Sequence, residues 1–277
     1  MGMKKKVLWG TVRIALVLLL AWGLCKVFSN YLDGQITELY RLNQTQVNAA
    51  NGTEQKDKGA VLFAETFRND TGMLVMGSSE LGSPVPENPK NLLPNQYYTK
   101  NVSYTGHAYV QNALQAMLLG ANSDTVDGSD VVIVESIQWF MGGDATGFLS
   151  NFSELSFYRF LQNGALSEES KEYLCNRFIE KQESGAHNVF DELTRRFSEG
   201  SKLHFIGQVA EKAKKVLPDF FQLHVDYPQT YTLAKLYTSD SFLGRLCYYI
   251  TCPYYSIRNE FLSLKDKFSA YRYLKDL

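Results

Sequence analysis

The chain has 277 residues with 28 basic and 29 acidic side chains, so its formal net charge is −1. This balance excludes the basic field that nucleic-acid-binding proteins use, and we expect no nucleic-acid partner. A hydrophobic content of 45% predicts a chain that folds around a core. Aromatic residues are concentrated from Phe157 onward, where we expect them to form core or a protein interface.

The N-terminus predicts a membrane anchor. Three lysines precede an apolar segment, residues 7–28, which Arg13 and Lys26 interrupt. About 20 apolar residues cross a bilayer, and basic residues ahead of a span hold that end in the cytoplasm. We therefore expect residues 1–6 in the cytoplasm and everything after the span outside the cell membrane. A cleaved signal peptide is the alternative, because the uninterrupted apolar centre is short.

The rest of the chain divides into three parts. Residues 29–59 predict a stalk and a polar linker, residues 60–150 an α/β core, and residues 151–277 a helical region. The apolar side of the stalk consists of Leu32, Ile36, Leu39 and Tyr40. The helices expected in the last part cover residues 152–161, 169–183, 188–197, 203–216 and 254–274.

Two apolar runs in the α/β core predict buried strands, Gly72 to Met76 and Asp130 to Glu135, with a helical pattern after Gly106 between them. A strand, a helix and a second strand with a continuous apolar run indicate a parallel sheet that is covered on both faces. The expected fold class is therefore α/β.

The first strand ends in Gly77-Ser78-Ser79, a turn that lifts a hydroxyl onto the carboxyl edge of such a sheet, where open α/β folds keep their sites. Serine is a weak nucleophile, so chemistry here requires a histidine base and a carboxylate that orients it. The alternative is an ordinary strand-to-helix turn in which a serine caps the helix.

We predict no metal ion and no cofactor. The acidic residues at positions 124, 127 and 130 lack the spacing of an EF-hand loop. The close pair Cys247 and Cys252 has no second pair and no nearby histidine, so it is a poor metal site. We expect these two cysteines to be buried thiols, with a disulfide between them as the alternative.

Three sequence blocks resemble the DltD family, the membrane-anchored D-alanyl-lipoteichoic acid biosynthesis proteins of Gram-positive bacteria. The blocks are Gly77-Ser78-Ser79-Glu80, Gly106-His107 and Gln138-Trp139-Phe140, in this order behind a membrane anchor. The resemblance implies an SGNH-hydrolase-like (flavodoxin-like) parallel sheet, here incomplete, with a large helical insertion. It also implies transfer of D-alanyl groups to lipoteichoic acid outside the membrane.

The resemblance assigns roles to single residues. Ser79 matches the nucleophile of SGNH esterases, with Ser78 as the fallback. The Ser79 backbone, Gly106 and the Gln138 side chain match the donors that stabilise the developing oxyanion. By their own patterns, Gly106 is equally a helix-start glycine and Gln138 a polar residue at a strand end. The implied partners are lipoteichoic acid, a D-alanyl donor or carrier, and membrane proteins of the D-alanylation system.

The chain departs from the family at the catalytic base. Family members take the base and its orienting acid from an Asp-x-x-His block, and none of the four histidines here follows an aspartate by three residues. Those histidines are His107, His187, His204 and His224. Two alternatives therefore stand beside D-alanyl transfer. One is a non-catalytic or truncated membrane-anchored partner, and the other is an SGNH-type esterase or O-acyltransferase that acts on another wall polymer.

Overall fold

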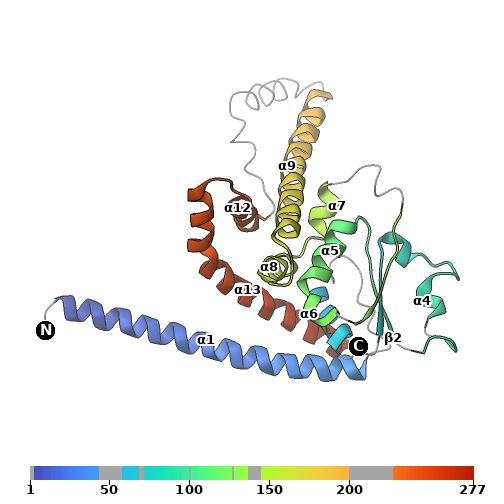
Figure 1. Cartoon of the computed structure of the whole chain (residues 1–277), viewed down its shortest axis with the longest axis horizontal. Helices are drawn as coiled ribbons and strands as arrows, with labels where there is room; N and C mark the ends of the chain where they lie inside the picture. Colours follow the sequence, from blue (N-terminus) through green and yellow to red (C-terminus); the bar gives the residue numbers. More distant parts are fainter. Residues whose placement is uncertain are drawn as a thin grey trace.

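The computed structural model describes residues 3–43, 58–68, 72–93, 95–99, 101–126, 128–136, 145–199 and 227–277. For some of these, including residues 3–8 and 185–199, it describes the backbone alone. The described chain is mostly helical. Figure 1 shows a small sheet beside a larger group of helices, with a long N-terminal helix extending to one side.

The sheet has three parallel strands in the order β2-β1-β3. They are β1 (Gly72–Met76), β2 (Asn101–Thr105) and β3 (Asp130–Ile133). The two predicted strands are confirmed, whereas β2 was not predicted. Met76 of β1 pairs with Thr105 on one side and with Ile133 on the other, so the carboxyl ends of the strands form one edge.

Both faces of the central strand β1 are covered. Leu74 and Met76 are fully buried against α3 (Ala60–Arg68) and α5 (Asn112–Ala121). Val75 faces the other side and packs with Tyr104. The Tyr104 hydroxyl donates to the Pro89 carbonyl at 2.7 Å, which ties α4 (Pro89–Leu92) over this second face. The short helices η2 (Ser79–Gly82) and α6 (Ser123–Val126) complete this part.

The prediction that the second apolar strand is buried is wrong. Val132 and Ile133 of β3 are 43% and 44% exposed. The physical reason is position, because β3 lies at the edge of the three described strands and no described strand pairs with its outer side.

The helical region consists of α7 (Ala145–Ser150), α8 (Glu154–Gln162), α9 (Glu168–Glu199), α12 (Pro228–Tyr237) and α13 (Phe242–Asp276). Its core is aromatic, as expected: Phe152 stacks on Phe178 with ring centroids 4.4 Å apart, and Phe157 and Tyr158 are fully buried beside them. The segments expected at 169–183 and 188–197 form one continuous helix. The helix expected at 203–216 lies outside the described residues.

The N-terminal helix α1 (Met3–Leu42) is the one helix of the described chain that is long and apolar enough to cross a membrane. Its apolar stretch is assigned to Leu16–Leu42, which overlaps the predicted span of residues 7–28. Beyond residue 28 the helix continues without a break. There Leu32, Ile36 and Tyr40, three residues of the predicted apolar side, are buried against α3 and α13.

All four cysteines are free. The expectation of buried thiols at positions 247 and 252 is wrong for Cys247, which is exposed, while Cys252 is half-buried. Both lie on α13, and the side of this helix that carries Cys247 faces away from the protein core.

Candidate functional site

The candidate site begins at the turn that follows the central strand. The Gly77 N–H donates to the Thr105 carbonyl at 2.9 Å, so the turn starts as a continuation of the β1–β2 pairing. A Cβ atom on Gly77 would lie 2.7 Å from the Glu80 carboxylate and 2.8 Å from the Leu81 side chain. The tight fold-back of η2 over the strand end therefore requires glycine here.

Ser78 has a structural role in this turn. Its side chain is 3% exposed, and its hydroxyl donates to the His107 carbonyl at 2.9 Å. Its N–H donates to the Glu80 carboxylate at 2.5 Å. These bonds join the turn to the loop that follows β2. Because the Ser78 hydroxyl is buried and already donates, it is poorly placed to attack a substrate.

Ser79 presents the opposite environment. It is the first residue of η2 and is exposed, and its hydroxyl has no hydrogen-bond partner among the described residues. Ser78 occupies the N-cap position and makes no side-chain capping bond. Neither hydroxyl therefore serves as the helix cap that the alternative interpretation requires.

Gly106 lies directly beside this turn. A Cβ atom on Gly106 would come 2.8 Å from the carbonyl carbon of Gly77 and 2.9 Å from its oxygen. The two glycines allow the loops after β1 and β2 to approach closely at the carboxyl edge. The last residues of β1 and β2, Met76 and Thr105, pair with each other. Ser79 and Gly106 follow shortly after these residues and so lie at the same edge of the sheet.

Comparison with known proteins identifies the family. The sequence model of the DltD protein family matches residues 49–220, more than half of the chain. This chain belongs to the DltD family. It is 24% identical to Protein DltD of Bacillus subtilis (strain 168) over 181 residues, which make up 63% of this chain and 44% of that protein.

Protein DltD of Staphylococcus aureus (strain NCTC 8325 / PS 47) is similar to the chain at the same level. The two are 24% identical over 146 residues, 52% of this chain and 37% of that protein. The matched part of the chain therefore spans less than half the length of these curated relatives.

The other candidate residues are only partly described. Gln138, the third predicted oxyanion donor, lies outside the described residues, as do His204, His224 and the His187 side chain. His107 is exposed, and its ring contacts the Ala108 carbonyl at 3.2 Å. No described histidine ring is hydrogen-bonded to Ser79.

Gln115 is a site residue that sequence reasoning missed. It lies in the first turn of α5, is 1% exposed, and donates to the Gly77 carbonyl at 3.2 Å. Its side-chain oxygen has no partner in the described structure. Because Gln115 lies beside the apolar stripe of this helix rather than in it, the sequence pattern gave no signal of its burial. The buried Gln115 side chain therefore holds the Gly77 turn from its protein-facing side.

A small cavity of about 200 Å³ borders the N-terminus of α5, between this helix and α9. Arg177 and Lys181 line it together with Asn112, whose amide donates to Glu135 at 2.9 Å. Lys181 is 8% exposed and has no bonding partner in the described part of the chain, whereas Arg177 pairs with Glu180. Lys181 and the N-terminus of α5, which has no acidic residue in its first turn, both favour an anion here.

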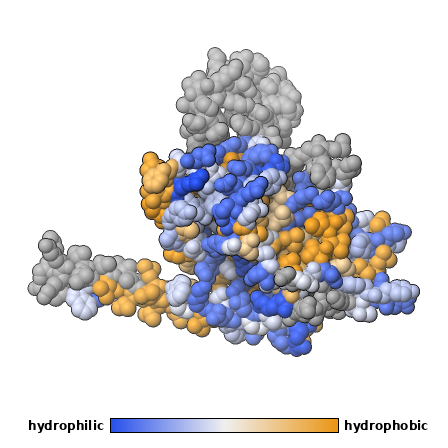
Figure 2. All heavy atoms as spheres, viewed as in Figure 1, coloured by the Kyte–Doolittle hydropathy of each residue, from blue (hydrophilic) through white to orange (hydrophobic). Residues whose placement is uncertain are grey.

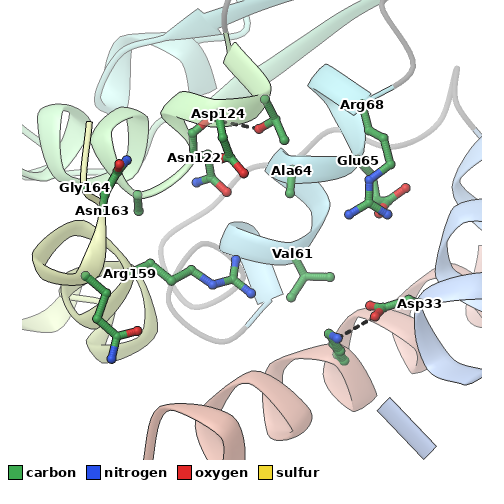
Figure 3. A pocket seen from close by; sticks show the side chains of 14 residues that line it. Asp33, Val61, Ala64, Glu65, Arg68, Asn122, Asp124, Arg159, Asn163 and Gly164 are labelled. Atoms are coloured by element: carbon green, nitrogen blue, oxygen red, sulfur yellow. Dashed lines mark hydrogen bonds and ion pairs between the residues drawn. The ribbon is translucent and has the colours of Figure 1, made fainter. Parts of the chain in front are cut away.

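A larger polar cavity of about 510 Å³ lies at the opposite edge of the sheet (Figure 3). Arg68, the last residue of α3, and Asp124, which precedes β3, line it, so it borders the amino ends of the strands. The Arg159 guanidinium points into it, and burial lowers the pKa of Arg159. Three acidic and three basic side chains line this cavity, and it contains none of the predicted site residues.

Proposed function

We propose that this DltD-family chain takes part in the D-alanylation of lipoteichoic acid on the outer side of the cell membrane, with Ser79 as the residue that carries the acyl group. The observation that carries the proposal is an exposed, unbonded hydroxyl at the carboxyl edge of the central strand. Open α/β sheets bind their ligands outside this edge.

The strand order supports an SGNH-like arrangement. In flavodoxin-like sheets, whose order begins 2-1-3, the ligand crevice opens between strands 1 and 3, where the chain reverses direction across the sheet. Ser79 follows β1 in a sheet of the order β2-β1-β3, which supports this position for the proposed nucleophile. In this proposal residues 60–150 form the first part of the sheet, and the helices from α7 to α13 are the large insertion.

The proposed chemistry has two steps. The Ser79 oxygen attacks the carbonyl carbon of a D-alanyl ester or thioester, its proton passes to a base, and the bond to the donor breaks. A hydroxyl of the polymer then attacks the Ser79 ester, and the serine is released with a proton. The Ser79 N–H, the Gly106 backbone and Gln138 are the proposed donors to the oxyanion, and loss of one such donor costs about 10²–10³ in rate.

The base is the missing part of this mechanism. The sequence contains no Asp-x-x-His block, and the described structure brings no histidine ring to Ser79. We therefore expect little hydrolytic activity from these 277 residues alone. This observation favours a second candidate function, in which the chain is a non-catalytic membrane-anchored partner of the D-alanylation system.

The cavity beside α5 supports an anionic acceptor. D-alanylation adds ammonium groups that offset the phosphate charge of lipoteichoic acid, so the polymer meets the protein as a polyanion. Lys181 and Arg177 supply positive charge next to the α5 terminus, and the Gln115 contact places the first turn of this helix under the Ser79 turn. A D-alanyl donor or carrier and membrane proteins of the same system complete the proposed set of partners.

The proposed topology follows from the N-terminus. In this proposal the three lysines at the start of α1, ahead of its apolar stretch, hold that end in the cytoplasm, so the sheet and the helical region face the outside.

Complementation tests the proposed role of Ser79. The full chain is expressed in a Gram-positive strain without its own DltD-family protein, and ester-linked D-alanine on teichoic acid is measured. The proposal requires that the chain restores it together with the other proteins of the D-alanylation system. Ser79→Ala is expected to lose this activity, and Ser83→Ala, a matched change just after the same turn, is expected to keep it. Normal D-alanine content with Ser79→Ala overturns the assignment.

Two further results separate the alternatives. Failure of the unchanged chain to restore D-alanine, with normal membrane expression, supports the non-catalytic partner. Hydrolysis of short-chain esters by the purified full chain, without D-alanyl transfer, supports an SGNH-type esterase or O-acyltransferase that acts on another wall polymer.

A further inference from the structure

The N-terminal half of α13 is apolar on two opposite sides. Its inner side contributes Tyr255 to the buried helical core, where Tyr248 and Leu262 also pack. A helix on the surface of a soluble protein carries polar residues on its outer side, whereas a helix that is apolar all round is buried or contacts lipid. The outer side of α13 is not buried in the described structure, so its composition requires an explanation.

The outer side forms one uninterrupted stripe, which we call the α13 outer face. Its residues follow each other at steps of three and four and are 42–70% exposed: Leu243, Leu246, Ile250, Tyr254, Ile257 and Phe261. None of the stripe residues is charged. Arg258 and Glu260 lie at its margins and pair with Glu154 and Lys26, whereas Arg245 lies on the other side of the helix and donates to the Ser239 carbonyl. Tyr254 adds an aromatic ring with a polar tip, the type of side chain that is enriched at membrane interfaces.

The α13 outer face lies at the level of the membrane-spanning part of α1. Three contacts show that the two helices run in the same direction: Lys26 with Glu260 at 2.5 Å, Asp33 with Lys267 at 2.7 Å, and Asn43 with the Leu274 carbonyl at 3.1 Å. The N-terminal halves of both helices therefore project to the same side of the protein. On α1 this half carries exposed apolar residues that include Leu18 and Trp22.

The two apolar surfaces meet in one groove. A cavity of about 620 Å³ lies between the helices, lined by Leu18 and Trp22 of α1 and by Ile257 and Phe261 of α13. Beyond the groove α13 curves away from α1 (Figure 1). Pro253 lies in this helix and lacks the N–H that would bond to the carbonyl one turn earlier, which accounts for a bend. Figure 2 shows apolar side chains on the N-terminal part of α1 and on the N-terminal end of α13.

We propose that the α13 outer face lies on the lipid bilayer beside α1, so that the protein contacts the membrane at two places. The occupant is lipid rather than protein because the stripe is continuous, through the groove, with the helix that crosses the membrane. Its exposed residues are leucine, isoleucine, tyrosine and phenylalanine, the kind of side chain that the apolar face of an interfacial helix carries. This proposal does not depend on the chemistry of Ser79.

Fluorescence quenching by lipids tests the contact in the full chain, reconstituted into vesicles of phosphatidylglycerol and phosphatidylcholine. Cys25, Cys247 and Cys252 are replaced by serine, while Cys175, which is fully buried, remains. An environment-sensitive dye is then attached to Ile250→Cys. We expect nitroxide-labelled lipids to quench it about as strongly as a dye at Val17→Cys in α1, and far more strongly than one at Tyr97→Cys, which is 89% exposed.

The outcomes separate the possible occupants. Quenching at position 250 that is as weak as at Tyr97→Cys overturns the proposal. A blue-shifted emission without lipid quenching also overturns it and indicates a protein on this face, which is a second copy if the shift depends on protein concentration. With Leu243→Asp and Phe261→Asp added, lipid quenching at position 250 is expected to be lost while thermal unfolding is unchanged, since both side chains are exposed. Quenching that persists in this variant contradicts the proposed contact.

Discussion

The close approach of two glycines at the carboxyl edge gives a prediction about Gly106→Ala. The new Cβ would lie 2.8 Å from the Gly77 carbonyl carbon and 2.9 Å from its oxygen. Non-bonded carbon atoms are at their optimum about 3.5–4.0 Å apart. Both contacts are with backbone, which has no rotamer to change, so either the strand ends must separate or the Ser79 turn must move.

The expected cost follows from this overlap. Insertion of a methylene-sized group into a closely packed place lowers the free energy of unfolding by about 1–3 kcal/mol. With a urea dependence of about 2 kcal/mol per M, a loss of 2 kcal/mol lowers the unfolding midpoint by about 1 M. We expect the slope of the transition to remain the same, because the native contacts elsewhere are unchanged.

Gly82→Ala is the matched control for this measurement. Gly82 ends the same turn, and a Cβ atom there would meet nothing within 4 Å. We expect its free energy of unfolding to stay within about 0.5 kcal/mol of that of the unchanged chain, so that the midpoint moves by no more than about 0.25 M. Equal midpoints for Gly106→Ala and Gly82→Ala, measured by circular dichroism on the full chain in detergent, would refute the close approach of the two loops.

Two further predictions concern titratable groups. Burial raises the pKa of Glu65 above its ordinary value of 4.5, although Arg68 and Thr37 partly offset it, so the folded state holds this proton more tightly than the unfolded state. The free energy of unfolding should therefore fall as the pH rises from about 4.5 through the raised folded value, and Glu65→Gln should flatten that slope in urea titrations at several pH values. Burial also raises the pKa of the Cys175 thiol. Maleimide at neutral pH should therefore modify the exposed Cys247 and leave Cys175 unmodified until urea unfolds the chain. Peptide mass spectrometry measures this, and rapid modification of Cys175 in the native chain would contradict the packing.

The sequence predicted the elements that have a strong apolar pattern. The run Gly72 to Met76 became β1 with the same bounds, because a continuous apolar segment before a glycine turn has few other solutions. Strand β2 was missed because only Val102 and Tyr104 alternate with polar residues in its five positions. β2 forms because it pairs with β1 along its whole length. That pairing is a tertiary contact, which the local sequence of β2 does not reveal.

The sequence predicted the turn after β1, but it did not predict the buried side chains that hold this turn in place. The Gly-Ser-Ser turn could be predicted from the sequence, because a strand that ends in glycine indicates a tight turn, whereas the proposed role of Gly106 came from the family resemblance. The sequence could not show that Ser78 and Ser79 differ in role, because the two hydroxyls differ only in their surroundings. The Ser78 hydroxyl donates to the His107 carbonyl, and the Ser79 side chain is exposed. Gln115 was not predicted because its role depends on the approach of α5 to Gly77 across 38 residues of chain.

The continuation of α1 beyond residue 28 bears on the substrate of the proposed site. A flexible stalk would let the sheet sample many heights above the bilayer, but residues 29–42 are helical, and Leu32, Ile36 and Tyr40 are packed against α3 and α13. If the span ends at residue 28, these 14 residues hold their far end at most about 21 Å above the membrane surface, at about 1.5 Å per residue. The α13 outer face, if it lies on the bilayer, fixes the tilt as well as the height. A carboxyl edge at a fixed height and tilt suits an acceptor that extends outward from the membrane, such as a polymer chain, better than a group within the lipid layer.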